Sequence, residues 1–135
     1  MFFMDGKLAS AKTGLTYGQT NYLVRKGLIT PISISQGKPR EFSYRDLVML
    51  RLAAELRADG YRLDAISQAL TELRTHWTSE NPEEAGWMLV IGGFFVWVSE
   101  TPTISDKEGK TKTHLGPYPR HIYYVTGLAW QVEDV

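Results

Sequence analysis

A chain of 135 residues, 43% of them hydrophobic, can bury its own core as one domain or as a small domain with an added module. Because the chain has no cysteine, disulfides, thiolate metal sites and a cysteine nucleophile are excluded. The net charge is zero, but residues 1–77 carry eleven Lys/Arg and seven Asp/Glu, whereas residues 78–135 carry four and eight.

Two short helices are predicted near the start of the chain. The opening residues have no basic stretch before a long apolar run, and therefore no signal-peptide pattern. Residues 5–12 are expected to form a helix that stops at Gly14. Thr16 suits the N-cap of a second helix, residues 17–26, which Gly27 would end.

The helix predicted at residues 17–26 has two different sides. Thr20, Leu23 and Val24 are spaced i, i+3 and i+4, which predicts the buried side. The other side is polar and aromatic and comprises Tyr17, Gly18, Asn21, Tyr22 and Arg25, with Gln19 at the boundary. Such an outer face is too polar for a buried helix, so we expect it to lie on the surface.

A small hairpin is predicted next. Residues 32–42 alternate isoleucine with serine before the turn signal Gln-Gly-Lys-Pro, after which the chain can return. Lys38 and Arg40 would lie on or beside the tip of this hairpin. The sequence therefore predicts a basic hairpin directly after the polar helix.

Two longer helices follow the hairpin. Ser43 and Asp46 have the spacing of a capping box, and the helix that they begin should run to about Ala58. Its expected apolar face comprises Leu47, Leu50, Ala54 and Leu56. The next helix, at about residues 63–76, has Leu63, Ile66, Leu70 and Leu73 at helical spacing. The short connection predicts that the two helices are antiparallel neighbours.

The last third of the chain has a strand pattern. Residues 78–86 are polar, contain proline and glycine, and are expected to be a linker. The run WMLVIGGFFVWV (87–98) predicts a β-hairpin around its two glycines, and it is too short to span a bilayer. Residues 103–115 are a second hairpin or a loop, and HIYYV (121–125) and LAWQV (128–132) are two further strands.

The predicted elements together indicate an α+β fold with two parts. Residues 1–77 are mostly helical, residues 78–86 connect, and residues 87–135 are a small, mostly antiparallel β module. The sequence indicates a cytoplasmic protein without a membrane part.

The order of helix, glycine turn, helix, basic hairpin and capped helix pair resembles the MerR-type winged helix-turn-helix transcriptional regulators. GLTYGQTNYLVRKGLITP (14–31) is similar to the family pattern G-[IL]-T-Y-x-Q-x-D-Y-W-x-R-x-G-L-[VI]-x-P. FSYRDLVMLRLAAELRADGYRL (42–63) is similar to Y-S-x-R-D-L-x-x-L-x-x-x-x-x-L-x-x-x-G-x-S-L. The resemblance covers about residues 5–76. The chain departs from the pattern at Leu23, where tryptophan is usual, and at Gly18, where a basic residue is frequent.

The resemblance implies that residues 1–77 form a winged helix-turn-helix that binds double-stranded DNA and regulates transcription. Helix 17–26 would read the major groove, and the basic wing 32–42 would follow the flanking backbone. Amides suit adenine, arginine suits guanine or phosphate, and tyrosines donate to phosphates. The expected DNA-binding residues are Tyr17, Gln19, Asn21, Tyr22, Arg25, Lys38 and Arg40.

No pattern in the sequence predicts an enzyme, a cofactor or a metal site. His76, His114 and His121 do not have the spacing of metal ligands. The chain has no phosphate-binding loop, no dinucleotide fingerprint and no nucleophile elbow. We therefore expect a binding protein.

The aromatic tail, residues 87–135, is open to several interpretations. It has more apolar residues than a small meander can cover, so it is a dimerisation module, a docking surface for a partner protein, or a cap on the helices. It is alternatively an effector pocket lined by Trp87, Trp97, Trp130 and tyrosines. Two other functions remain open: an antitoxin-type or recruitment protein whose tail binds a partner, and an architectural or excision-type DNA-binding factor.

Overall fold

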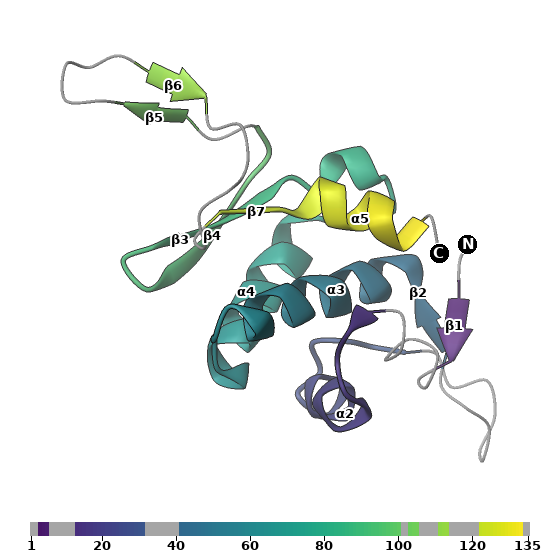
Figure 1. Ribbon diagram of the computed structural model, residues 1–135. Coiled ribbons are helices and arrows are strands. Elements are labelled where there is room, and N and C mark those ends of the chain that lie inside the picture. The colour runs from purple at the N-terminus through teal and green to yellow at the C-terminus, as the bar shows by residue number, and fades with distance from the viewer. Residues whose placement is uncertain are drawn as a thin grey trace.

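The computed structural model describes residues 3–5, 13–31, 41–100, 103–105, 111–113 and 122–133; of residues 3–5, 103–105, 111–113 and 133 only the backbone is described. The described elements are, in chain order, β1 (Phe3–Asp5), α2 (Tyr17–Arg25), β2 (Glu41–Ser43), α3 (Tyr44–Ala58), α4 (Leu63–His76), the 3-10 helix η1 (Pro82–Glu84), β3 (Trp87–Ile91), β4 (Phe94–Val98), β5 (Thr103–Ser105), β6 (Thr111–Thr113), β7 (Ile122–Tyr124) and α5 (Val125–Glu133). The fold is α+β, as the sequence predicts, with helices α2–α5 and a small antiparallel sheet (Figure 1).

Helix α3 lies at the centre of the molecule. In Figure 1 it lies between α2 on one side and α5 on the other, and both α4 and α5 pack against it. Its buried residues surround the helix: Tyr44, Asp46, Leu47, Val48, Met49, Leu50, Leu52, Ala53, Ala54 and Leu56. The four residues of the expected apolar face are among them. The sequence pattern showed one apolar face, whereas the packing of several elements around α3 buries most of its residues.

The predicted starts and ends of the helices are largely confirmed. Helix α2 begins after the N-cap Thr16 and ends one residue before the predicted limit, at Arg25. Helix α3 begins with the capping box of Ser43 and Asp46. Gly27 and Gly60 have φ angles of +75° and +96°, which allow the chain to leave α2 and α3 in the left-handed region, and Gly14, before α2, has a φ angle of +92°.

Strand β2 has a partner that the sequence pattern did not predict. Glu41–Ser43 pairs antiparallel with β1, in the register Phe3↔Ser43 and Asp5↔Glu41. The prediction that a helix begins at Asp5 is therefore wrong, because Asp5 is in a strand. Two three-residue strands so far apart in the chain carry no local signal. The remaining parts of the predicted helix 5–12 and of the predicted hairpin 32–42 lie outside the described residues.

The hairpin predicted at residues 87–98 is confirmed. Strands β3 and β4 pair in the register Trp87↔Val98 to Ile91↔Phe94. Gly92 and Gly93, at the turn, have φ angles of +56° and +83°, as a two-residue turn between twisted strands requires. Strand β7 pairs with the other edge of β3, so that the sheet order is β4-β3-β7. Strands β5 and β6 form a separate antiparallel pair.

The prediction of a strand at LAWQV (128–132) is wrong. These residues belong to α5. Val125, Leu128, Ala129 and Val132 are buried, and their spacing is i, i+3, i+4 and i+7. The β propensities of tryptophan and valine are weaker than the benefit of burying this helical stripe against α3.

Residues 78–86, expected to be a linker, are partly built into the core. They contain η1, and Ala85 and Gly86 are buried. Trp77, next to this segment, is 1% exposed, and its indole nitrogen donates to the carbonyl oxygen of Asn81 at 3.0 Å. One continuous hydrophobic core contains residues of the helices before this segment and of the tail after it.

Within the described part of the chain, no helix is long and apolar enough to cross a membrane.

Candidate nucleic-acid interface

Helix α2 is held in place by its cap and by its buried side. The Thr16 hydroxyl accepts from the backbone nitrogen of Gln19 at 3.1 Å, and the Gln19 side-chain oxygen accepts from the backbone nitrogen of Thr16 at 3.0 Å. Thr20 and Leu23 are 1% and 0% exposed, which confirms two of the three residues of the predicted inner side. Val24, the third, is half-buried and packs against the core.

The end of α2 is attached to the longer helices. The amide nitrogens of Gly27 and Leu28 donate to carbonyl oxygens in the last turn of the helix. A guanidinium nitrogen of Arg74, in α4, donates to the carbonyl oxygen of Gly27. Because α4 is itself packed on α3, this contact orients α2 relative to the core.

The opposite side of α2 faces outward. Tyr17 is 54% exposed, and Gly18 and Arg25 are exposed as well. Asn21 and Tyr22 are half-buried, and the ammonium of Lys26 lies 5.6 Å from the centre of the Tyr22 ring. The structure therefore brings Tyr17, Asn21, Tyr22 and Arg25 to one short helix.

The side chain of Gln19 has a structural role that the sequence analysis did not anticipate. Its oxygen closes the capping box with Thr16, and this is the same oxygen that would accept from adenine in a bidentate contact. The signal was present in the sequence, since Thr and Gln stand three residues apart at the helix start. Lys38 and Arg40 lie outside the described residues.

His76 is the described histidine, and its side chain contacts two neighbours. The Nε2 atom of His76 lies 2.8 Å from a carboxylate oxygen of Glu72, and the imidazole stacks on Trp97, with ring centres 5.1 Å apart. Among the described residues, no group of three or more His, Asp or Glu side chains has an arrangement that would hold a metal ion. His114 and His121 lie outside the described residues.

Comparison with known proteins gives the family. Residues 6–73, half of the chain, match the sequence model of the MerR HTH family regulatory proteins. The chain belongs to the MerR family. A search of curated proteins finds no match.

The MerR match covers the helical part of the chain. MerR-family proteins are DNA-binding regulators of transcription and are typically not enzymes. The matched residues contain α2, β2, α3 and most of α4. It ends at Leu73, within α4, so that the 3-10 helix, the three-stranded sheet and α5 lie outside it. The family match therefore includes α2, and it assigns no role to the tail.

The tail of this MerR protein is hydrogen-bonded to the central helix at both ends of α3. The Tyr44 hydroxyl donates to the carbonyl oxygen of Ala129 at 2.6 Å. At the other end, the Tyr123 hydroxyl donates to a carboxylate oxygen of Asp59 at 2.7 Å. Burial and the neighbouring Asp59 carboxylate raise the pKa of Tyr123, so the hydroxyl remains a donor at neutral pH. These contacts fix the sheet and α5 relative to the helices that carry α2.

Arg51 connects the same parts of the molecule through its side chain. One guanidinium nitrogen donates to the carbonyl oxygen of Thr13 at 3.5 Å, just before α2. The other donates to the side-chain oxygen of Gln131, in α5, at 3.4 Å and pairs with Glu55 at 2.8 Å. The segment that leads into α2 and the last helix of the tail therefore contact one residue of α3.

The buried carboxyl group of Asp46, in the capping box of α3, should make the free energy of unfolding depend on pH. Its side chain is 6% exposed, and burial raises its pKa above 3.8 despite the hydrogen bonds with Ser43. A raised pKa in the folded state means that the charged form is disfavoured by folding. The resulting loss of stability is absent below the unfolded pKa and complete above the folded pKa.

We expect Asp46→Asn to remove this dependence. The free energy of unfolding of the wild type, relative to the variant, should fall as the pH rises from about 3.8, the ordinary pKa, toward neutrality. Urea denaturation of both proteins between these limits measures the difference. A difference that stays constant with pH would contradict the assignment to Asp46.

Proposed function

We propose that α2 is the recognition helix and that its exposed side enters the major groove of double-stranded DNA. The observation that carries this proposal is the outward face of α2, which presents Tyr17 and Arg25 while Thr20 and Leu23 anchor the helix. A helix held on its inner side by a core is the geometry with which helix-turn-helix proteins read base edges.

The proposed contacts follow from the chemistry of the side chains. Arg25 pairs with guanine or a phosphate, and Asn21 pairs with adenine. Tyr17 and Tyr22 donate to phosphate oxygens and set the register of the helix. Gln19 contributes its side-chain NH2 group alone while its oxygen remains in the cap. Lys38 and Arg40 belong to the proposed wing, residues 32–42, which follows the neighbouring backbone.

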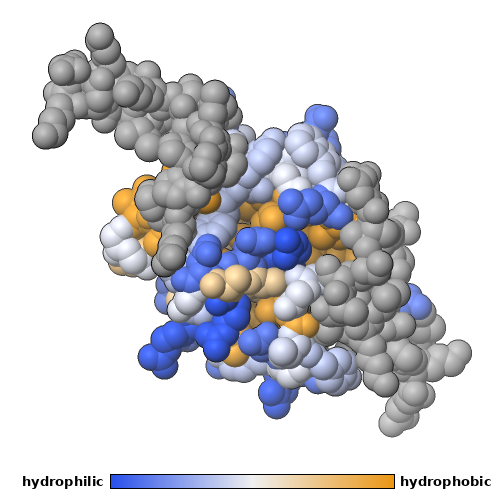
Figure 2. Space-filling view, in the orientation of Figure 1, coloured by the Kyte–Doolittle hydropathy of each residue, from blue (hydrophilic) through white to orange (hydrophobic). Residues whose placement is uncertain are grey.

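We further propose that the protein acts in the cytoplasm as a dimer, with residues 1–77 as the DNA-binding part and residues 87–135 as the assembly part. One recognition helix reads only a short site, and pairing two of them multiplies the affinity. An exposed apolar surface supports this assignment: Phe94 is 71% exposed, and Ile91 and Val96 are also exposed. Figure 2 shows hydrophobic surface at the left of the molecule, where Figure 1 has the β3–β4 hairpin.

The same hairpin favours a second candidate, an antitoxin-type or recruitment protein that binds a partner through its tail. Sedimentation of the purified full-length chain separates the two candidates. A dimer in the absence of any other protein supports the first. A monomer that forms a stoichiometric complex with a neighbouring gene product supports the second.

The reading of DNA is tested with Arg25→Ala. We expect the variant to bind its DNA site about 5-fold to 150-fold more weakly, which corresponds to a loss of roughly 1–3 kcal/mol for one base or phosphate contact. Thermal stability should stay within about 0.5 kcal/mol because the side chain is exposed. Binding is measured on sites selected from a random pool, over a range of salt concentrations.

Arg62→Ala is the matched control, since it removes the same charge from an exposed position. Arg62 and Arg74 lie near opposite ends of α4, and Arg74 is the one that contacts Gly27, at the end of α2. Twelve residues separate them, so Arg62 lies about 18 Å from Arg74 along the helix axis. The control should leave DNA affinity nearly unchanged. Equal effects of the two substitutions would mean that α2 contributes only general charge.

A further inference from the structure

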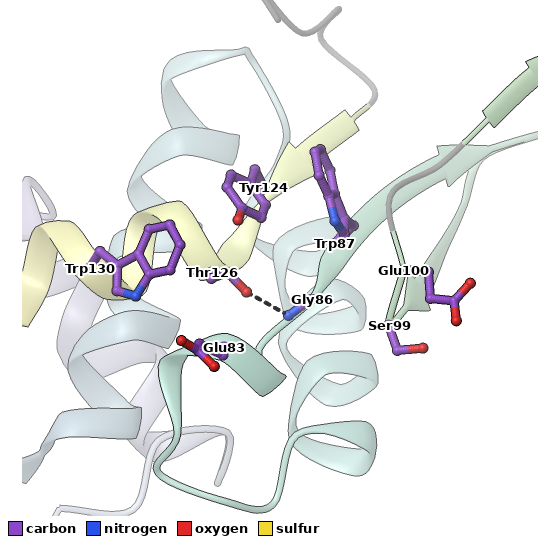
Figure 3. A pocket seen from close by; sticks show the side chains of 8 residues that line it. All are labelled: Glu83, Gly86, Trp87, Ser99, Glu100, Tyr124, Thr126 and Trp130. Atoms are coloured by element: carbon purple, nitrogen blue, oxygen red, sulfur yellow. Dashed lines mark hydrogen bonds between the residues drawn. The ribbon is translucent and has the colours of Figure 1, made fainter. Parts of the chain in front are cut away.

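An open pocket lies in the part of the chain that the family match leaves unassigned. It has a volume of about 400 Å³ and is formed by η1, the start of β3, the end of β4 and the junction of β7 with α5 (Figure 3). Small-molecule sites in proteins have volumes of roughly 300–1,000 Å³, so the pocket is large enough for a small ligand.

Three aromatic side chains border the pocket. The rings of Trp87 and Tyr124 stack with their centres 4.3 Å apart, and the Trp130 ring meets Tyr124 edge-on at 6.1 Å. Figure 3 shows Trp130, Tyr124 and Trp87 in a row across the upper part of the pocket. Trp130 is 44% exposed, which is unusual for so large an apolar side chain. The exposed part of its ring is available to contact a ligand in the pocket.

The floor of the pocket is formed before any ligand binds. The Gly86 amide nitrogen donates to the Thr126 hydroxyl at 3.0 Å, as the dashed line in Figure 3 shows. The Gly86 carbonyl oxygen accepts from the amide nitrogens of Val125 and Thr126 at 3.0 and 3.2 Å. These bonds join the end of the 78–86 segment to the start of α5. Glu83 and the three aromatic rings are therefore carried on one connected backbone frame.

The charge of the pocket is negative. Glu83 and Glu100 line it, and none of its lining residues is lysine or arginine. In Figure 3 the Glu83 side chain lies below Trp130, whereas the Glu100 carboxylate is directed outward at the far end. An aromatic face attracts a cation through its quadrupole, and a carboxylate beside it adds Coulomb attraction. An anion would meet repulsion from both glutamates.

We propose that this pocket binds a small organic cation of the quaternary-ammonium type. The cationic group rests against the ring of Trp130 beside the Glu83 carboxylate, and the apolar remainder lies along Tyr124 and Trp87. A metal ion would not use the aromatic faces, and a neutral ligand would lack the Coulomb attraction to the glutamates. The polar groups of the floor, at Gly86 and Thr126, are already hydrogen-bonded to each other.

Choline and its uncharged isostere 3,3-dimethylbutan-1-ol test the proposal on the full-length protein. The two molecules have nearly the same shape and differ by the positive charge. We expect choline to bind, by calorimetry and tryptophan fluorescence, at least about 5-fold more tightly than the isostere, since a cation–π contact is worth roughly 1 kcal/mol. Equal affinities, or no binding of choline at tens of millimolar, would overturn the proposal.

Two substitutions locate the cation. Glu83→Gln should weaken choline binding about 2-fold to 5-fold, the effect of losing one exposed charge pair, and Trp130→Phe should also weaken it. Glu84→Gln is the matched control, because Glu84 is an exposed residue of the same short helix that does not line the pocket. A control variant that loses as much affinity as Glu83→Gln would refute the site. Thermal melts establish that each variant is folded.

Discussion

Deletion of residues 87–135 is expected to unfold the helical part of the chain rather than to release an independent DNA-binding domain. The buried side chains of α5, namely Val125, Leu128, Ala129 and Val132, pack into the same core as α3. Burial of a large aliphatic side chain contributes about 1.5–3 kcal/mol, so the three largest of these together approach the whole stability of a typical domain, about 5–15 kcal/mol. Their loss also exposes the side of α3 that they cover.

The measurement is circular dichroism with urea denaturation of residues 1–86 beside the full-length protein. We expect the truncated chain to lose its cooperative transition. A matched control replaces the β5–β6 hairpin, residues 103–113, with a short Gly-Ser linker. These strands form their own sheet, and Figure 1 shows them projecting away from the helices, so this change should cost little. A cooperative transition of residues 1–86 at the full-length midpoint would show that the helices fold alone.

Gly86→Ala is expected to be the most destabilising single substitution considered for this protein, at about 3 kcal/mol or more. Gly86 has a φ angle of +71°, and a Cβ atom there would lie 2.5 Å from the carbonyl oxygen of Val98 and 2.9 Å from the indole nitrogen of Trp97. A positive φ alone costs an L-residue roughly 1–2 kcal/mol, and contact with a backbone oxygen forces β4 to move as well.

Gly93→Ala is the control for the backbone strain alone. Gly93 has a φ angle of +83°, and a Cβ atom added there meets nothing within 4 Å. We therefore expect this variant to lose about 1–2 kcal/mol, and the excess at Gly86 to measure the contact with β4. Thermal and urea denaturation of both variants give the two values. Similar losses at the two glycines would show that the chain accommodates the contact by a small shift.

The helices α2, α3 and α4 could be predicted because their signals are local. The capping boxes of Thr16 and Ser43, the glycines at positions 14, 27 and 60, and the 3.6-residue spacing of α4 all act within a few residues. The Gly-Gly turn between β3 and β4 is local in the same way. Such features depend on backbone conformation and hydrogen bonds that neighbouring residues supply.

The candidate DNA-binding face could be listed from the sequence only in part. Helical spacing separates Thr20 and Leu23 from Tyr17 and Arg25, and the structure agrees with this separation. Spacing does not tell how a side chain is used, and Gln19, expected to reach DNA, closes the cap of its own helix. An amide side chain can serve either purpose, and in this conformation the side-chain oxygen of Gln19 accepts from the backbone N–H of Thr16.

By itself, the sequence determined the identity of the local elements: the capped helices, their glycine ends and the central hairpin of the tail. Only the tertiary structure decided that β2 pairs with β1, that residues 128–132 are helical, and that α3 is buried on most sides. The physical reason is distance along the chain. Burial of α5 against α3 and the assembly of an aromatic pocket from η1, β3 and α5 depend on contacts between segments 40 to 85 residues apart, which no local pattern encodes.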